Sequence, residues 1–479
     1  MAGAKDRSSF LDHHHFIGNS KSVNPQDPMR DVKNKHIIVI GAAKSGIAVA
    51  LLLKRKAADV FVSDYGLINK EFKSKLQSAE IPFEENGHTE KAKQADFAVV
   101  SPGVPTESPI VQHYLNSDKD VYSEIEVASW FTDARIVAVT GSNGKTTVAN
   151  WLDHLWNLAK RDHHLSGNIG IAFSDVAESA SGDQLLEVSS FQLDHISTFK
   201  PDVSLILNIT PDHLNRYNND LDAYAASKFR ITENQTENDR FIFNYDDAII
   251  QKHVETLKKK QATPELWAFS YKNEVPEGAF VRNDHIIFKF NNKEESLMPV
   301  EEIGLRGQHN LSNGLATALA ARAAEIKNDA IRESLRSFTG VEHRLELARK
   351  VDGVKYINDS KATNVNAVWF ALDSFHVPLT LILGGRDKGN DYSELVPQIK
   401  EKVHTIIAIG ESKDRIEEQL GKVVPNFVRV ETMGGAVRAA NKGAKKGEVV
   451  LLSPACASFD MFDSYEHRGK IFKEEVNKL

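Results

Sequence analysis

The chain has 479 residues, of which 41% are hydrophobic and 26% are charged, and its net charge is −7 at pH 7. This length is enough for roughly two to four domains, and the negative charge excludes a general electrostatic attraction to nucleic acid or to anionic membranes. The single cysteine, Cys456, excludes an intramolecular disulfide framework, and no apolar run approaches the roughly 20 residues that span a bilayer. We therefore expect a cytoplasmic α/β protein that neither binds nucleic acid nor inserts into a membrane.

The first 28 residues predict no folded segment. They contain three consecutive histidines at 13–15, two prolines, scattered Ser and Asn, and no apolar periodicity. We interpret residues 1–28 as a disordered expression leader and Met29 as the natural start. The histidines then say nothing about function.

Alternating strands and helices begin after this leader. The predicted elements are a strand at 36–40, a helix at 47–56, and strands at 60–64 and 97–100. The first three form a βαβ unit, which is typical of a parallel sheet. We place the first domain at 29–123.

The same alternation continues in two further domains. In the central domain, at 124–340, we expect a helix at 124–130, a strand at 136–140, a helix ending at Trp156, strands at 202–209, 240–244 and 285–290, and a helix at 311–326. In the third domain, at 341–479, we expect strands at 354–358, 379–383, 404–409 and 448–452. The fold class is therefore α/β with three domains.

The strongest chemical signal follows the strand at 136–140. A strand that enters a glycine turn points successive backbone N–H groups inward, and the following helix N-terminus adds positive potential, so together they form a phosphate cradle. Lys145 can reach the β- and γ-phosphates of a nucleotide, and Thr146 can ligate Mg²⁺. Full P-loop spacing requires glycine where Val139 stands, so this is a shortened version, and the alternative is a plain β-turn-α connection. The segment consists of Gly141, Ser142, Asn143, Gly144, Lys145, Thr146 and Thr147.

The glycine turn of the first domain is a weaker signal. The segment Gly41 to Gly46 has Ala43 in place of the middle glycine that lets a backbone approach a dinucleotide closely. Asp64 ends the second predicted strand, where an acid commonly accepts hydrogen bonds from a ribose or a base. A structural turn held by this acid is the alternative. A ligand bound here would be a nucleotide held differently from NAD.

Two further polar residues follow strands of the central domain. Glu187 and His213 lie where open α/β sheets place ligands, and a carboxylate beside a triphosphate is a reasonable partner for Mg²⁺. Taken singly, each is more often a surface or loop residue. Their occurrence together with the cradle favours function. Lys228, by itself, is an exposed helix lysine.

These residues and their surroundings resemble, in order, the Mur ligases of peptidoglycan synthesis. The matching segments are 137–147, 167–170, 187–193, 208–214, 308–313, 342–344 and 358–364, and the resemblance runs from about residue 36 to the C-terminus. Within this family, the segments 358–364 and 453–460 are similar to the branch that adds D-glutamate. The Asp-Asn-Pro-Arg element of the branch that adds a diamino acid is absent from the sequence.

The resemblance implies a fold and a reaction. It implies a Rossmann-like N-terminal domain for the UDP end of the substrate, a central P-loop ATPase domain with a mostly parallel sheet, and a Rossmann-like C-terminal domain for the amino acid. The implied partners are ATP, UDP-N-acetylmuramoyl-L-alanine and D-glutamate, with two Mg²⁺ ions, in a monomer. The implied route is an acyl phosphate followed by a tetrahedral intermediate.

The resemblance also implies roles for individual residues. Catalysis is assigned to Lys145, Glu187, His213, Lys228 and Asn168. The implied metal ligands are Thr146, Glu187, His213 and Lys228, with the lysine carbamylated because an ammonium cannot bind Mg²⁺. ATP is assigned to residues 141–147 with Asn310, Asn313, Arg344 and Asp359. The UDP-linked substrate is assigned to Gly41, Asp64, Tyr65, Ser101, Gly103, Asn168, Ser189 and Gln192. D-Glutamate is assigned to Lys361, Thr363, Lys388, Ser458 and Phe459.

Two other functions remain open. Another Mur-type or folylpolyglutamate-synthase-like ligase would share the central ATP chemistry and would differ in the amino acid and the acceptor that it joins. A nucleotide-gated binding protein would need the cradle but not Glu187, His213 and Lys228 together. Cys456 lies among the implied D-glutamate residues, but we interpret it as a small buried residue because an acyl phosphate route needs no thiol.

Overall fold

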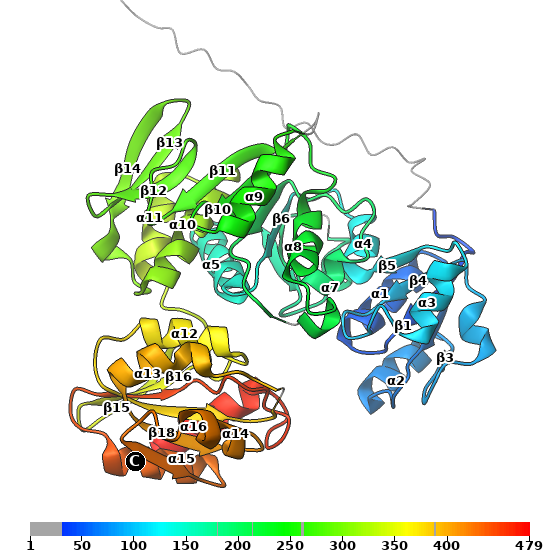
Figure 1. Ribbon diagram of the computed structural model, residues 1–479. Coiled ribbons are helices and arrows are strands. Elements are labelled where there is room, and N and C mark those ends of the chain that lie inside the picture. Colours follow the sequence, from blue (N-terminus) through cyan, green and yellow to red (C-terminus); the bar gives the residue numbers. More distant parts are fainter. Residues whose placement is uncertain (1–30, 180, 213, 260–262, 388) are drawn as a thin grey trace, which may run out of the picture.

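The computed structural model describes residues 31–479 except 180, 213, 260–262 and 388. Three α/β units follow one another along the chain, each built on its own sheet (Figure 1). The predicted α/β class is therefore confirmed. The leader expected at 1–28 lies outside the described residues. No described helix combines the length and apolar character needed to cross a bilayer.

The first unit is a five-stranded parallel sheet in the order β3-β2-β1-β4-β5. Its strands are β1 (His36–Ile40), β2 (Asp59–Ser63), β3 (Phe83–Glu84), β4 (Phe97–Val100) and β5 (Val121–Ser123), and its helices are α1 (Lys44–Arg55), α2 (Lys70–Ser78) and α3 (Pro109–Asn116). The strand order reverses direction at β1 and β4, and ligands bind beyond the carboxyl ends of strands at such a point. α1 begins three residues earlier than predicted, because the helix starts directly at the glycine turn.

Close backbone packing explains the glycines of this turn. Gly41 has a φ of +93°, and a Cβ on Gly46 would lie 1.9 Å from the Gly41 carbonyl oxygen. No larger residue fits at position 46 without moving the turn. The turn therefore presents the N-terminus of α1 at the carboxyl edge of the sheet.

The central unit is a nine-stranded sheet in the order β14-β13-β12-β11-β10-β9-β6-β8-β7. Its strands are β6 (Ile136–Thr140), β7 (His163–Gly167), β8 (Asp183–Glu187), β9 (Val203–Ile206), β10 (Arg240–Asn244), β11 (Glu265–Ser270), β12 (Gly278–Arg282), β13 (His285–Phe290) and β14 (Lys293–Pro299). The sheet is parallel from β7 to β12, and β13 and β14 extend it as antiparallel strands. Its helices include α4 (Glu124–Ser129), α5 (Lys145–Leu158), α6 (Phe173–Val176), α7 (Ser190–Leu193), α8 (Leu221–Phe229), α9 (Ala248–Leu257), α10 (Gln308–Ala323) and α11 (Asn328–Ser337).

Strand β9 ends at Ile206, three residues earlier than predicted. The next residues leave the sheet because they bond to the loop after β6: Ser142 N donates to the Asn208 carbonyl oxygen at 2.9 Å, and Asn143 N donates to the Asn208 side chain at 2.9 Å. The apolar segment after β9 thus supports the cradle loop instead of extending the strand.

Small residues let α10 pack deeply in this unit. Its alanines, such as Ala316 and Ala320, are fully buried, and a Cβ on Gly314 would lie 3.2 Å from the indole ring of Trp151 in α5. Close packing of this kind leaves little room for substitution. It fixes α10 beside the helix that starts at the cradle.

The third unit is a six-stranded sheet in the order β15-β16-β20-β17-β18-β19. Its strands are β15 (Glu346–Val351), β16 (Val354–Asn358), β17 (Leu379–Gly384), β18 (Val403–Ile409), β19 (Asn426–Arg429) and β20 (Val449–Leu452), and its helices are α12 (Val365–Asp373), α13 (Val396–Lys402), α14 (Lys413–Leu420), α15 (Met433–Gly443) and α16 (Tyr465–Asn477). β15 pairs with β16 in the antiparallel sense, and the other pairs are parallel. The four predicted strands are confirmed within one residue.

Helix α4 joins the first two units. Its side chains are divided between two apolar cores: Ile125 packs in the central unit and Val127 packs in the first unit. The buried carboxylate of Glu126 accepts hydrogen bonds from the backbone N–H groups of Ser197 at 2.9 Å and Phe199 at 2.7 Å. The domain boundary that we place at residue 123 stays a prediction. Helix α4, which packs in both cores, starts at the next residue.

A buried carboxyl in α4 predicts that the stability of the protein depends on pH. Glu124 is buried there, its Oε1 accepts a hydrogen bond from Ser174 N at 2.6 Å, and burial raises the pKa of the carboxyl to about 7. An unfolded glutamate titrates near about 4.3, so folding takes up a proton between these values and the free energy of unfolding falls as pH rises toward 7. We expect the free energy of unfolding of Glu124→Gln to be higher than that of the wild type by on the order of 2–3 kcal/mol at pH 8. At pH 4.5 the two free energies should be nearly equal.

Urea unfolding at several pH values measures this difference. Glutamine keeps an acceptor for Ser174 N, so contributions of other titrating groups cancel between the two proteins. A difference that does not change between pH 4.5 and pH 8 would contradict the raised pKa of Glu124.

Candidate active site

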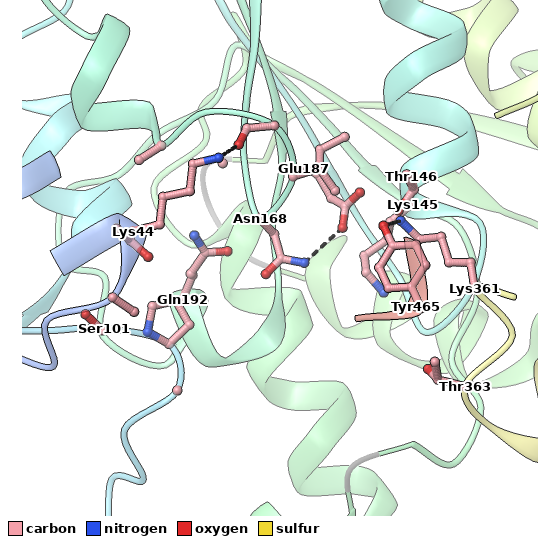
Figure 2. Close-up of a pocket in the computed structure, with 18 of the residues that line it drawn as sticks. Lys44, Ser101, Lys145, Thr146, Asn168, Glu187, Gln192, Lys361, Thr363 and Tyr465 are labelled. Carbon is pink, nitrogen blue, oxygen red and sulfur yellow. Dashed lines mark hydrogen bonds between the residues drawn. The ribbon is translucent and has the colours of Figure 1, made fainter. Parts of the chain in front are cut away.

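A cavity of about 860 Å³ lies where the three units meet (Figure 2). The first unit contributes its glycine turn, the central unit contributes the cradle, and the third unit contributes the segment after β16 and the start of α16. The predicted site residues on its wall are Gly41, Asp64, Ser101, Gly103, Ser142, Asn143, Gly144, Lys145, Thr146, Asn168, Glu187, Gln192, Arg344, Lys361 and Thr363. Residues far apart in the sequence are therefore brought to one space.

The cradle is built between β6 and α5. Gly144 caps α5 with a φ of +88°, and a Cβ there would lie 2.6 Å from the Asn313 side-chain oxygen. The first turn of α5 carries no acidic side chain, so its positive end is free to attract an anion. Lys145 Nζ donates to the carbonyl oxygens of Gly141 at 2.7 Å and Ser142 at 2.8 Å, and burial lowers its pKa.

The carboxylate of Glu187 lies at the carboxyl end of β8. Its Oε1 accepts a hydrogen bond from Asn168 Nδ2 at 2.9 Å, whereas its buried Oε2 has no partner among the described residues. Thr146, 7% exposed, lines the same cavity. Mg²⁺ prefers oxygen ligands, so a hydroxyl and an unpaired carboxylate oxygen fit this ion. His213, the predicted partner, lies outside the described residues.

Lys228 of α8 is 1% exposed, not exposed as its helix position alone suggests. Its Nζ lies 4.4 Å from the ring centroid of Tyr224 and makes no hydrogen bond or ion pair with another described residue. Burial, and then the nearby charge of Lys145, hold the pKa of this amine well below its usual value. A lowered pKa increases the uncharged fraction of an amine, and the uncharged form is the nucleophilic one.

The predicted nucleotide residues of α10 and the third unit lie behind the cradle. Asn310 and Asp359 line a small recess together with Arg344, and the buried Nδ2 of Asn313 has no partner among the described residues. Burial raises the pKa of Asp359 to about 6, although its side chain accepts hydrogen bonds from Ser453 Oγ at 2.7 Å and from a backbone N–H. Thr147 is 1% exposed and does not line the cavity.

The residues expected to bind the amino acid are only partly brought together. Lys361 and Thr363 line the cavity, but Ser458 is buried outside it and Phe459 is 63% exposed. The chain turns at this point, where Phe462 N donates to the Ser458 carbonyl oxygen at 2.9 Å, so Phe459 faces solvent. Lys388 lies outside the described residues.

Tyr465, and not Phe459, lies on the cavity wall beside Lys361. It is the first residue of α16, and Lys361 Nζ donates to its hydroxyl at 3.2 Å (Figure 2). Burial lowers the pKa of Lys361 to about 8. Tyr465 belongs to no motif with a recognisable residue spacing, so the sequence carried no signal that it would line the cavity.

A second cavity of about 800 Å³ opens on the first unit. Four predicted residues, Gly41, Asp64, Tyr65 and Gly103, lie on its wall, and Tyr65 is 81% exposed. The Asp64 carboxylate accepts hydrogen bonds from Ala42 N at 2.6 Å and Gly66 N at 2.7 Å. Asp64 thus holds the glycine turn, as the structural alternative expects, and the same residue borders both cavities, so its predicted role in ligand binding stays a prediction.

Hydrogen bonds explain three other residues expected to bind the UDP-linked substrate. Ser101 Oγ donates to the Gly41 carbonyl oxygen at 2.8 Å. Ser189 is not on the cavity wall but caps α7, where its hydroxyl donates to Gln192 Oε1 at 3.0 Å. Ser189 therefore orients Gln192, which does line the cavity.

Several wall residues were not predicted, namely Lys44, Ser45, Asp212, Asn364, Tyr465 and Glu466. Lys44 and Ser45 belong to the glycine turn, so that motif was a signal for them. Asp212 and Asn364 lie beside predicted residues, and their side chains bond to one another at 3.4 Å across two units.

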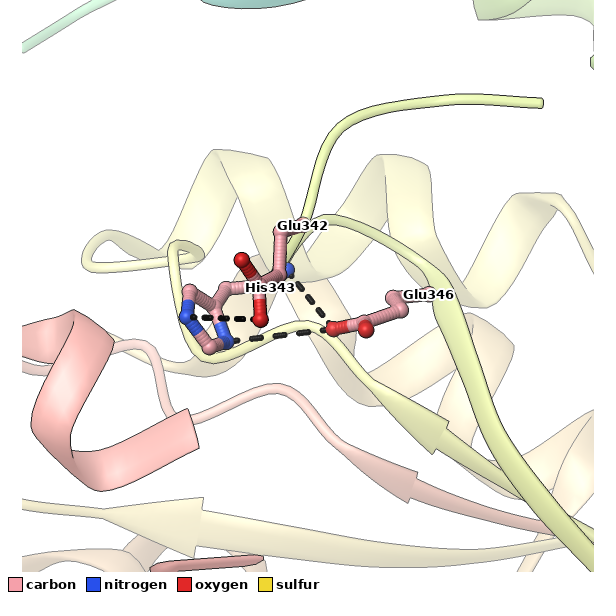
Figure 3. A group of neighbouring side chains, drawn as sticks. All are labelled: Glu342, His343 and Glu346. Carbon is pink, nitrogen blue, oxygen red and sulfur yellow. Dashed lines mark hydrogen bonds and ion pairs between the residues drawn. The ribbon is translucent and has the colours of Figure 1, made fainter. Parts of the chain in front are cut away.

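Glu342, His343 and Glu346 form a cluster that could in principle hold a metal ion (Figure 3). Lys473 Nζ already contacts both carboxylates, at 2.9 Å for Glu346. His343 is 6% exposed, and its Nδ1 lies 2.9 Å from Asn358 Nδ2. The ammonium of Lys473 thus provides the positive charge, and the cluster holds the loop before Arg344 instead of a metal.

Three family models match the chain in succession. They are a MurD N-terminal domain at residues 36–110, a Mur ligase middle domain at 139–321, and a Mur ligase glutamate ligase domain at 343–456. The matches fall on the three units in chain order.

Curated relatives match over almost their whole length. The UDP-N-acetylmuramoylalanine--D-glutamate ligase of Salinibacter ruber is 47% identical over 456 residues, which cover 94% of this chain and 99% of that protein. The protein of the same name from Bacteroides fragilis is 43% identical over 93% of this chain and 100% of that protein.

Solved structures share the fold at low identity. A pseudomurein peptide ligase type C from Methanothermus fervidus has a TM-score of 0.57 and 19% identity, over 93% of this chain and 100% of that chain. The UDP-N-acetylmuramate-alanine ligase MurC from Thermotoga maritima has a TM-score of 0.57 and 17% identity, over 93% and 99%. These two structures support the three-unit architecture and nothing finer.

Proposed function

The chain belongs to the Mur ligase family, and we propose that it joins D-glutamate to UDP-N-acetylmuramoyl-L-alanine while ATP is cleaved to ADP and phosphate, a step of peptidoglycan precursor synthesis. Relatives that carry the name of this reaction are 42–47% identical to the chain over more than nine tenths of its length. The family expected from the sequence is thereby confirmed.

One observation carries the proposal: a single cavity is lined by the glycine turn of the first unit, the phosphate cradle of the central unit, and Lys361 and Thr363 of the third unit. A reaction that joins three substrates needs the reacting atoms within roughly 3–3.5 Å. The space has one wall for each substrate, so the arrangement suits a ligase better than a nucleotide-gated binding protein.

The chemistry follows from the groups on these walls. A carboxylate is a poor electrophile, so the γ-phosphoryl group of ATP is first transferred to the carboxylate of the UDP-linked substrate. The amine nitrogen of D-glutamate then bonds to the acyl carbon and loses a proton, and phosphate leaves from the tetrahedral intermediate. Lys145 stabilises the negative charge on the transferring phosphoryl oxygens, and Asn168 is near the reacting carbonyl.

Thr146, Glu187, His213 and a carbamylated Lys228 would hold two Mg²⁺ ions. The buried oxygen of Glu187 that has no partner among the described residues and the lowered pKa of the Lys228 amine support this assignment. When bound, Mg²⁺ neutralises charge on the nucleotide phosphates and on the acyl phosphate.

We assign each substrate to the unit whose residues would bind it. ATP binds residues 141–147, Asn310, Asn313, Arg344 and Asp359. The UDP-linked substrate binds Gly41, Asp64, Tyr65, Ser101, Gly103, Asn168 and Gln192, with Ser189 acting through Gln192. The carboxylates of D-glutamate bind Lys361, Thr363 and Lys388, beside Tyr465. One chain supplies all three walls, so the site is complete within a monomer, and we assign the protein to the cytoplasm, where its substrates occur.

The proposal is tested by phosphate release with each substrate omitted in turn. We expect release only when ATP, UDP-N-acetylmuramoyl-L-alanine and D-glutamate are all present, and strong discrimination against L-glutamate and D-alanine. D-Alanine lacks the side-chain carboxylate and leaves a desolvated lysine unpaired. A folylpolyglutamate-synthase-like ligase would instead use L-glutamate with a folate acceptor.

Matched variants locate the amino-acid site. Lys361→Met should lower kcat/KM for D-glutamate by about 10–100-fold, since a charge-assisted contact is lost. Phe459→Ala is the control and should leave this value unchanged because Phe459 is exposed outside the cavity. Equal losses in both variants, or turnover of D-alanine at the rate of D-glutamate, would contradict the assignment.

A further inference from the structure

The loop that carries Arg344 has an unusual backbone. Arg344 lines both the main cavity and the recess beside α10, and it lies between His343, with a φ of +65°, and Leu345, with a φ of +46°. Residues with a side chain rarely adopt this left-handed conformation, and they keep it only where the surrounding structure holds the backbone. The direction of the Arg344 side chain therefore depends on the contacts that hold this loop.

The carboxylate of Glu346 holds the loop at its end (Figure 3). Its Oε2 accepts hydrogen bonds from His343 N at 2.9 Å and from Asn358 Nδ2 at 3.0 Å. The first bond closes the loop across Arg344, and the second fixes the carboxylate to the end of β16. A shift of the Glu346 side chain would therefore change the backbone on both sides of Arg344.

Lys473 of α16 provides the charge that fixes Glu346. Its Nζ donates to Glu346 Oε1 at 2.9 Å and also contacts Glu342 Oε1, so one ammonium joins the residues on either side of the segment 343–345. The side chains of Lys473 and Glu346 are each 24% exposed, so water screens this pair less than an ion pair on the open surface. Glu342, with 65% of its side chain exposed, contributes less.

Helix α16 packs directly against the loop. A Cβ on Gly469 would lie 2.3 Å from His343 Nδ1, so only glycine lets the helix approach this closely. The rings of His343 and Tyr465 meet edge-on, with 6.4 Å between their centroids. Lys473 lies four residues after Gly469 and therefore on the same face of α16. The helix that begins on the cavity wall thus carries the ammonium to the loop.

We propose that Lys473 is a positioning residue for Arg344: by bonding to Glu346 and Glu342 it fixes the loop, and so it holds the guanidinium of Arg344 toward the nucleotide. Lys473 itself lines neither the cavity nor the recess, so it acts through Arg344 and not on a substrate. This inference rests on the proposed function, which assigns Arg344 to ATP.

The test measures, by calorimetry with Mg²⁺ present, the binding of AMP-PNP, an ATP analogue with a nitrogen bridge between the β- and γ-phosphates. We expect Lys473→Met to weaken this binding by about 5–10-fold, because Glu346 loses its charged partner. Lys473→Arg keeps the charge and should keep most of the affinity. Lys478→Met is the matched control and should bind as the wild type does: Lys478 also forms an ion pair, but its partner, Glu475, lies on α16 itself.

A double-mutant cycle separates positioning from packing. Arg344→Met should weaken the binding of AMP-PNP by about 10–100-fold, because a charge-assisted contact is lost. Adding Lys473→Met to this variant should weaken binding by less than about twofold, because a residue that acts through Arg344 then has nothing left to position. Two effects that multiply in the double variant, or equal affinities of the wild type and Lys473→Met, would overturn the inference. Failure of the wild type to bind AMP-PNP would instead overturn the proposed function.

Discussion

Replacing Lys145 by alanine is expected to lower the rate of ATP-dependent ligation by about 10²–10³-fold, because the variant loses a positive charge aimed at the transferring phosphoryl group. Lys145 lies at the N-terminus of α5, and its ammonium is held by carbonyl oxygens of the cradle loop at 2.7 and 2.8 Å. Phosphate oxygens can replace these two carbonyl oxygens as acceptors, because a charged acceptor forms a stronger hydrogen bond with an ammonium. Phosphate release at saturating substrates measures the effect.

The fold of the Lys145 variant should survive, because the side chain lies on the cavity wall and its ammonium bonds only to carbonyl oxygens of the cradle loop. Thermal unfolding and circular dichroism check this. Lys252→Ala, on the exposed face of α9 in the same unit, is the matched control and should keep full activity. Near-normal ATP cleavage by folded Lys145→Ala would refute the role given to the cradle.

Replacing Lys228 by alanine is expected to cause a loss of similar size, about 10²–10³-fold. A fully buried lysine without an ion pair to another described residue is costly as a cation. Burial lowers the pKa of this amine and so favours its uncharged form, which can add CO₂. The addition forms an N–C bond, releases a proton and converts the side chain into an anionic oxygen ligand. The enzyme should therefore show a carbamate carbon signal in NMR after incubation with ¹³C-labelled bicarbonate.

Two variants distinguish this role from simple packing. Lys228→Ala leaves space that acetate or formate can fill, so added carboxylate should restore part of the activity. Lys228→Met fills that space with an apolar chain and should not be rescued. A free amine in the wild type saturated with bicarbonate, together with no rescue of the alanine variant, would exclude carbamylation.

Local motifs made the cradle predictable. The strand, the glycine turn and the helix start lie within twelve consecutive residues, 136–147, so their chemistry depends on neighbours in the sequence. Glu187 was expected from its place after a predicted strand and Asn168 from the resemblance alone, and the two side chains are hydrogen-bonded at 2.9 Å. Short-range patterns and the family resemblance together identified most of the central wall.

The rest depended on tertiary structure. The strands β3 and β5 have two and three residues, which is too short for a periodic pattern. The burial of Lys228 follows from the packing of α8 against other elements, and helix position alone suggested exposure. Tyr465 lines the cavity whereas Phe459 faces solvent, because the chain turns after Ser458, and no residue spacing reveals such a turn.

The contacts between the central and third units have a consequence for turnover. The cradle residue Asn143 donates to the Asn366 side chain at 2.7 Å, Asn364 contacts Asp212 at 3.4 Å, and His309 stacks on Phe370 at 4.6 Å between ring centroids. Hydrogen bonds of this kind contribute only about 0.5–1.5 kcal/mol each, because water replaces them when the units separate. Separating the third unit from the central unit would therefore break a few weak contacts and leave the apolar core of each unit intact, so we expect the release of products to need no unfolding within a unit.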